Sequence, residues 1–159
     1  MSDGDPERIF IVDHMLGSLA RWLRMLGYNS YYDKLLSDNE IVEIGRREGR
    51  KILTRDRELA GRGDGLYISS TELEEQLVTV SKEFSLSYRH DRMRCSVCNG
   101  LLQKIDADSV KNEVPQRSFE NAKEFWRCAS CRKIYWDGTH WKGIMDRFER
   151  LGLMRGSEE

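Results

Sequence analysis

The sequence predicts an α/β fold with a mainly parallel sheet, followed by a small ribbon held together by four cysteines. Two observations carry this prediction. Short apolar runs alternate with amphipathic segments of helical periodicity through residues 9–84, and parallel strands need such helical crossovers. All four cysteines then fall in two Cys-x-x-Cys pairs, at 95–98 and 128–131. We therefore expect a first domain over residues 1–88, a ribbon over 89–142, and a short amphipathic helix with a polar tail over 143–159.

The elements of the first domain follow from local patterns. Residues 9–12 form a continuous apolar run, which is typical of a strand buried on both faces of a parallel sheet. Leucines at helical spacing come next, and Gly27 ends that helix. Two capping boxes, Ser37 with Glu40 and Thr71 with Glu74, predict the starts of two more helices. The other predicted elements are strands over residues 28–32, 51–54 and 66–69, and a short helical turn over 57–62.

Composition limits the setting but not the chemistry. The chain has 159 residues and a formal net charge of −1, so bulk charge gives no argument for nucleic-acid binding. No apolar run approaches the roughly 20 residues that a membrane span needs, and no N-terminal signal peptide is visible. We therefore expect a cytoplasmic protein without a membrane partner. Residues 86–94 break the periodicity, which predicts a basic linker.

The two cysteine pairs predict one structural zinc ion. Two residues between the thiols of each pair, within a tight turn, let both sulfurs reach one ion at about 2.3 Å. Together Cys95, Cys98, Cys128 and Cys131 complete a closed shell with no open position for a substrate. The alternatives are unligated thiols or a redox pair, which two matched pairs disfavour. The long spacing between the pairs predicts an inserted hairpin or loop around residues 106–119.

Several aspartates follow predicted strands. Asp13 comes directly after the first strand, Asp33 after the second, and Asp56 lies two residues beyond the third; Asp38 opens the helix that leads into that third strand. Ligands of open parallel sheets bind beyond the carboxyl ends of the strands, so these acids are expected to converge there. Such a cluster favours Mg²⁺ or Mn²⁺. Each acid also has a simpler interpretation: a helix-dipole partner for Asp38, a turn residue for Asp33 and a helix cap for Asp56.

Cations and aromatics lie near both predicted centres. Arg21 and Arg24 are on the first helix and Arg55 adjoins Asp56, where they could hold phosphate oxygens of a nucleic acid. Beyond the second cysteine pair, an aromatic and basic cluster could stack bases and bind phosphates. The alternatives are an ordinary solvated surface and tryptophans that fill the ribbon core. The residues of this second group are Arg132, Lys133, Trp136, His140 and Trp141.

The combined motifs resemble the Mut7-C family over about residues 8–146. They read FIVDHMLGSLARWLRMLGY at 10–28, SDNEI at 37–41, ILTRDREL at 52–59 and CASCRKIYWDGTHW at 128–141. The resemblance implies a PIN-like three-layer sandwich followed by a zinc ribbon, with acids that hold Mg²⁺ or Mn²⁺. It implies catalytic and metal-binding roles for Asp13, Asp38 and Asp56. The chain departs from the pattern of PIN nucleases because it lacks a clear equivalent of their helix glutamate, which leaves Asp33 or Glu40 as a shifted ligand.

The sequence thus predicts a metal-dependent ribonuclease whose zinc ribbon aids binding of single-stranded or structured RNA. In this hypothesis a metal-bound water attacks the phosphate, and the arginines place the RNA backbone. Two alternatives stay open: a non-catalytic RNA-binding protein, and a toxin-like protein-interaction module. The oligomeric state is left undetermined.

Overall fold

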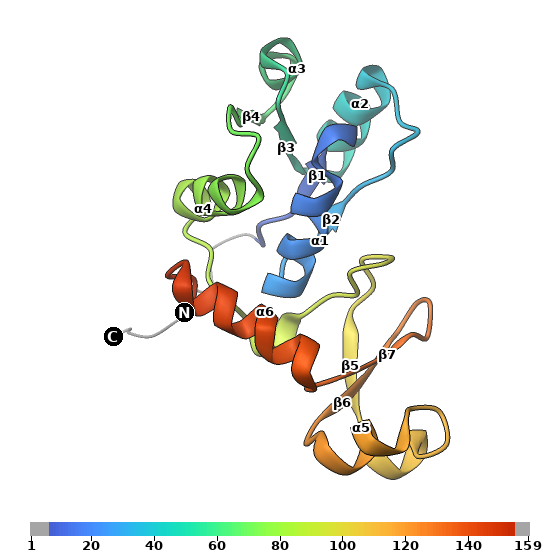
Figure 1. Cartoon of the computed structure of the whole chain (residues 1–159). Coiled ribbons are helices and arrows are strands. Elements are labelled where there is room, and N and C mark those ends of the chain that lie inside the picture. The colour runs from blue at the N-terminus through green and yellow to red at the C-terminus, as the bar shows by residue number, and fades with distance from the viewer. Residues whose placement is uncertain (1–6, 155–159) are drawn as a thin grey trace.

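Four parallel strands form the central sheet of the computed structural model, which describes residues 7–154 (Figure 1). Their order is β2-β1-β3-β4, and every neighbouring pair is parallel. The predicted mainly parallel α/β fold is confirmed. The strands are β1 (Phe10–Val12), β2 (Ser30–Tyr31), β3 (Lys51–Thr54) and β4 (Gly65–Tyr67).

Helices cover both faces of this sheet, as the three-layer prediction requires. Phe10 and Leu53 share one hydrophobic cluster with residues of α1 and α4. Ile11 and Ile52, which are paired across β1 and β3, share another cluster with residues of α2 and α3. Side chains of successive strand residues point to opposite faces, so the continuous apolar run of β1 is used on both sides. The helices are α1 (Gly17–Leu26), α2 (Asp38–Glu48), α3 (Arg57–Arg62) and α4 (Leu73–Phe84).

One of the two predicted capping boxes is present. At the start of α2 the Ser37 hydroxyl accepts from the Glu40 N–H at 3.1 Å, and the Glu40 carboxylate accepts from the Ser37 N–H at 2.8 Å. The box predicted from Thr71 and Glu74 is wrong. Helix α4 begins after Glu72, one residue later than predicted, and has no side-chain cap. In the turn before it, the Ser70 hydroxyl accepts from the Glu72 N–H at 3.0 Å.

The cysteine-bearing part is a three-stranded antiparallel sheet in the order β5-β6-β7. The insertion between β5 and β6 is helical rather than the expected hairpin or loop. It folds because Val110 and Val114 bury their side chains against Phe125 of β6. A 12-residue helix, α6, follows β7. The elements are β5 (Leu102–Ile105), η3 (Ala107–Val110), α5 (Gln116–Asn121), β6 (Phe125–Cys128), β7 (Ile134–Trp136) and α6 (Thr139–Arg150).

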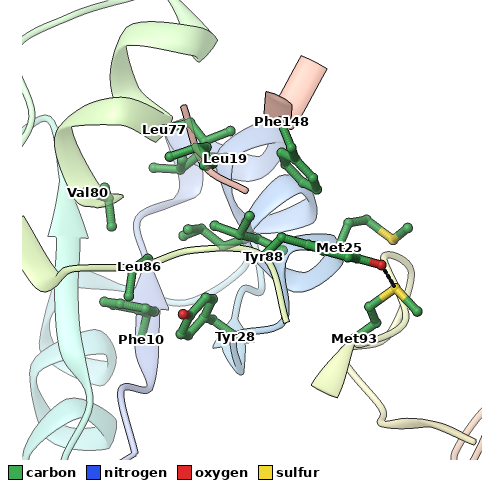
Figure 2. Packing of buried hydrophobic residues seen from close by; sticks show 14 of the residues in the cluster. Phe10, Leu19, Met25, Tyr28, Leu77, Val80, Leu86, Tyr88, Met93 and Phe148 are labelled. Carbon is green, nitrogen blue, oxygen red and sulfur yellow. Dashed lines mark hydrogen bonds between the residues drawn. The ribbon is translucent and has the colours of Figure 1, made fainter. Parts of the chain in front are cut away.

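The segment expected to be a linker belongs to the main core. Leu86, Tyr88 and Met93 are buried in the same cluster as Phe10 (Figure 2). The Tyr88 hydroxyl donates to the Met93 sulfur at 3.0 Å. The segment also contains the short helix η2 (His90–Arg92). A basic linker is therefore the wrong description, because the apolar residues of this segment are part of the main core.

Helix α6 lies against α1 and α4, as Figure 1 shows, and ties the ribbon to the sheet domain. Phe148 of α6 is fully buried, and its ring meets that of Trp22 edge-on at 5.6 Å. The predicted division between residues 88 and 89 therefore separates two sheets but not two cores. Residues 155–159 of the predicted polar tail lie outside the described residues. None of the helices within residues 7–154 has the length and apolar character needed to cross a membrane.

Arg24 joins the two parts from within the protein. It is only 4% exposed, its Nε donates to the Ser30 carbonyl at 2.9 Å, and its Nη1 donates to the Ser96 carbonyl at 2.8 Å. The prediction that Arg24 contacts an RNA phosphate is wrong, because both carbonyls engage the guanidinium and the side chain does not reach the surface. It holds the first cysteine knuckle against β2.

We predict that Arg24→Met lowers the free energy of unfolding by about 2–4 kcal/mol, because two buried carbonyl groups lose their donor. The matched control is Arg21→Met, on the exposed face of the same helix, which should stay within about 0.5 kcal/mol of the unmodified chain. Urea denaturation measures both values. Equal stability of the two variants would show that Arg24 does not hold the parts together.

Candidate functional site

Asp13 is the buried acid at the carboxyl end of β1. It is 3% exposed and lies at the start of the 3₁₀ helix η1 (His14–Leu16). Its Oδ2 accepts from the Thr54 hydroxyl at 2.7 Å, and its Oδ1 lies 2.9 Å from the His14 Nδ1. A buried carboxylate is costly unless it is hydrogen-bonded, so these partners explain how the fold tolerates Asp13.

Thr54 connects Asp13 to Asp56. While its hydroxyl donates to Asp13, the same oxygen accepts from the Asp56 N–H at 2.9 Å. The exposed Asp56 side chain caps α3, where it accepts from the Glu58 N–H at 2.9 Å. The capping interpretation of Asp56 is therefore confirmed. Sequence reasoning missed the orienting contacts of Thr54 and His14, whose only signal was their place beside the two strand ends.

The other two acids of the predicted cluster lie in a turn and at a helix start. Asp38 is the exposed first residue of α2, and Asp33 accepts from the Leu35 N–H at 3.0 Å in a turn. Within residues 7–154, one group of three or more His, Cys, Asp or Glu side chains has all its ligand atoms within 4.8 Å of one another, and that group is the four cysteines. Three acids therefore do not come within this distance of one another at the sheet edge. The edge presents Asp13 and Asp56 on either side of Thr54.

The four cysteines form a group that fits a tetrahedral metal ion. The Cys95 and Cys131 sulfurs are 3.7 Å apart, and those of Cys98 and Cys128 are 3.4 Å apart. A tetrahedral zinc–sulfur shell with bonds of about 2.3 Å requires sulfurs about 3.8 Å apart. Cys95 and Cys128 are buried, whereas Cys98 and Cys131 are exposed.

Each knuckle is shaped by its backbone. Asn99 and Arg132 have left-handed φ values of 73° and 72°, which turn the chain after each pair. A Cβ at Gly100 would lie 2.7 Å from the Cys128 sulfur, so this position needs glycine. Burial opposes ionisation of Cys128, but the N–H groups of Cys131 and Ser130 donate to its sulfur and lower the pKa of the thiol to about 7. Burial raises the pKa of the neighbouring Cys98 thiol. The hydroxyl of Tyr135 lies 3.0 Å from the Cys95 sulfur.

The predicted phosphate-binding cations differ in availability. Arg21, Arg132, Lys133 and His140 are exposed. Arg55 is half-buried, and its Nη2 donates to the Ser69 carbonyl at 3.0 Å. In the segment over residues 86–94, Arg89 and Arg92 both form salt bridges to Glu7, with N–O distances of 2.9 and 3.5 Å.

Trp141 does not offer a ring face to a base. It is 7% exposed and stacks on Trp126, with centroids 4.8 Å apart and planes 13° from parallel. The prediction that Trp141 stacks on RNA is wrong, and the core-filling interpretation of this residue is confirmed. Trp136, in contrast, is only half-buried.

A pocket of about 450 Å³, the α1–ribbon pocket, lies between α1, β7 and the start of α6. It brings together four of the predicted RNA contacts, Arg21, Lys133, His140 and Trp141. Sequence reasoning missed the contributions of Trp22 and Tyr135, because they meet only when the ribbon folds back on α1. The remaining lining residues are Met25, Ser96, Ile134, Trp136, Gly138, Thr139 and Ile144.

Comparisons with known proteins agree on one relationship. The family model described as the Mut7-C RNAse domain matches residues 8–148. The human protein "Exonuclease mut-7 homolog" is 33% identical over 122 residues, which is 67% of this chain and 14% of that protein. The chain therefore spans a small part of this relative's length. No solved structure matches the chain. Since the family model covers both the sheet domain and the cysteine ribbon, the chain belongs to the Mut7-C family, a family of nuclease domains.

Proposed function

We propose that this protein is a metal-dependent ribonuclease that cleaves RNA phosphodiester bonds at the carboxyl edge of its parallel sheet. The observation that carries the proposal is Asp13, a buried carboxylate at the end of β1, oriented by the Thr54 hydroxyl at 2.7 Å. Membership of a nuclease family supplies the reaction class. Thr54 and His14 fix both carboxylate oxygens of Asp13 at this edge, so its geometry is set before any ion or substrate binds.

The residues present suit a sparsely coordinated Mg²⁺ or Mn²⁺ ion. Proteins commonly hold Mg²⁺ through one or two carboxylates, with water and substrate phosphate as the other ligands. Asp13 and Asp56 would supply these carboxylates. Asp38, at the start of α2, would contribute a further ligand to the ion. When bound, the ion lowers the pKa of a water and stabilises charge on the phosphate. Thr54 and His14 orient Asp13, while Arg55 lies between Thr54 and Asp56 and places the RNA backbone.

We further propose that zinc occupies the four-cysteine group and stabilises the ribbon. The sulfur–sulfur distances of 3.4 and 3.7 Å are close to those of four thiolates arranged tetrahedrally around zinc. A closed thiolate shell leaves no position for substrate, so the ion is structural and the ribbon aids RNA binding through its surface.

A non-catalytic RNA-binding protein is the second candidate. It is favoured by one observation: within residues 7–154, no three carboxylates present ligand atoms within 4.8 Å of one another. A site with two carboxylates binds its ion weakly, and RNA binding without turnover would follow if it bound none. Cleavage assays separate the two candidates.

Asp13→Asn should reduce Mn²⁺-dependent cleavage of labelled RNA below detection, because the neutral amide is a poor ligand for a hard cation. Asp146→Asn is the matched control, since Asp146 is an exposed acid on α6 far along the chain from the sheet edge. The assay compares both variants with the unmodified protein, with and without Mn²⁺. Undiminished cleavage by Asp13→Asn would contradict the assignment of the site.

Thr54→Val should lower the cleavage rate at limiting Mn²⁺ by about 10- to 100-fold, the usual effect of removing a residue that orients a metal ligand. A higher Mn²⁺ concentration should restore much of this loss, which a merely structural defect would not allow. Thr79→Val is the control, because the Thr79 hydroxyl donates only to the Glu75 carbonyl of its own helix, at 2.7 Å. A loss that is the same at every Mn²⁺ concentration would rule out positioning by Thr54.

Purified protein should carry about one zinc ion per chain, as expected for a four-thiolate site. Cys128→Ser should lose the ion and unfold the ribbon, because metal binding supplies much of the folding free energy of so small a sheet. Ser130→Ala, in the same knuckle but without a ligand, should retain zinc. Elemental analysis and circular dichroism measure these outcomes. A ribbon that stays folded and metal-free would refute the structural role.

A further inference from the structure

The α1–ribbon pocket has walls suited to a flat aromatic ligand. Trp22 of α1 and Trp136 of β7 are both half-buried and line it, together with Tyr135. Its volume of about 450 Å³ lies within the range of about 300–1,000 Å³ that is usual for small-molecule sites. The Tyr135 hydroxyl is held by the Ser96 N–H at 3.2 Å, so one wall is fixed by the first cysteine knuckle.

The charge around this pocket is positive, although the chain as a whole has 27 acids and 26 Lys and Arg residues. The lining contains two cations, Arg21 and Lys133, but neither Asp nor Glu. Neither Arg21 nor Lys133 forms a salt bridge to an acid within residues 7–154. Both cations are exposed, so they remain available to an anionic ligand.

Two neighbouring features extend the positive surface. Helix α6 begins at the pocket, and its Gly138 N-cap provides no side chain for the first N–H groups, which leaves donors for an anion. A second hollow of about 610 Å³ shares Trp136 and His140 with the pocket and adds Arg117 and Lys142. Its one acid, Asp137, accepts from the backbone N–H groups of residues 123 and 124 at 2.8 and 3.1 Å.

We propose that the α1–ribbon pocket receives one unstacked base of a single-stranded RNA, while Arg21 and Lys133 hold the adjoining phosphates. Every base has a flat face that stacks on aromatic side chains, and unpaired RNA presents such bases. A ligand that combines a flat ring with negative charge matches both the walls and the rim. The proposal rests on RNA as the substrate of the proposed function, but not on cleavage.

The α1–ribbon pocket lies close enough to the acidic edge to hold the RNA strand that is cleaved there. Helix α1 begins four residues after Asp13, and Arg21 and Met25 lie on it. With a rise of about 1.5 Å per residue, the ten residues of α1 span about 15 Å. An RNA strand anchored beside α1 would therefore reach the acidic edge within a short distance. The pocket would fix the register of the strand relative to Asp13.

Intrinsic tryptophan fluorescence tests this directly, since Trp22, Trp136 and Trp141 line the pocket and the chain has 4 tryptophans. Oligouridine is compared with an abasic ribose–phosphate strand of the same length and with uridine monophosphate, without added divalent ions or chelator. Oligouridine should quench the fluorescence and bind roughly 5- to 150-fold more tightly than the abasic strand, as expected for one stacked base. Equal affinity for the two strands would overturn the proposal, as would monophosphate binding as tight as that of the oligomer.

Charge reversal at the rim provides the second arm. Arg21→Glu and Lys133→Glu should each weaken oligouridine binding and reduce the slope of log affinity against log salt by roughly 0.7, the effect of one lost phosphate contact on a single strand. Lys82→Glu, an exposed lysine on α4 outside the pocket, is the matched control. The same loss in all three variants would overturn the proposal. Because no divalent ion is present, an inactive protein can still bind as predicted, and an active nuclease can still fail this test.

Discussion

Helix α1 is the element on which the rest of the structure depends, because it is packed from two sides. Leu19 and Leu23 are fully buried in the cluster that includes Phe10 of the sheet. Towards the ribbon, the Arg24 guanidinium donates to the Ser96 carbonyl, and Trp22 meets Phe148 of α6. A buried charge is tolerated only with such partners, so the ribbon must dock for Arg24 to be satisfied. The sheet domain and the ribbon consequently share one core.

The same helix relates the two candidate functional regions. The acidic edge lies just before α1 in the chain, where the Thr54 hydroxyl of the neighbouring strand β3 donates to Asp13. The α1–ribbon pocket uses the helix as one wall and β7 as another. Anything that displaces the ribbon would therefore remove the pocket, because β7 and the start of α6 form its other walls. This arrangement gives a physical reason for the parallel sheet and the four-cysteine ribbon to occur in one compact unit.

Local signals predicted the elements well, and long-range contacts account for the rest. The strands, the Ser37 capping box and the cysteine pairs each depend on residues a few positions apart. Arg24 was misassigned because its partner Ser96 lies 72 residues away, and no local pattern distinguishes a buried arginine from an exposed one on the same helix. Trp141 was misassigned because Trp126 covers its face. The expected cluster of acids depended on side-chain directions, which the order of strands does not determine.

Amide hydrogen exchange, measured before and after a chelator removes the proposed zinc ion, tests most directly whether the sheet domain and the ribbon share one core. Loss of the ion should open the ribbon, and the Ser96 carbonyl should then no longer hold Arg24. If the two parts share one core, amide protection falls in α1, particularly over residues 19–26, together with that of β5, β6 and β7. Unchanged protection of α1 beside an exchanging ribbon would contradict it, because the two parts would then be separate folding units.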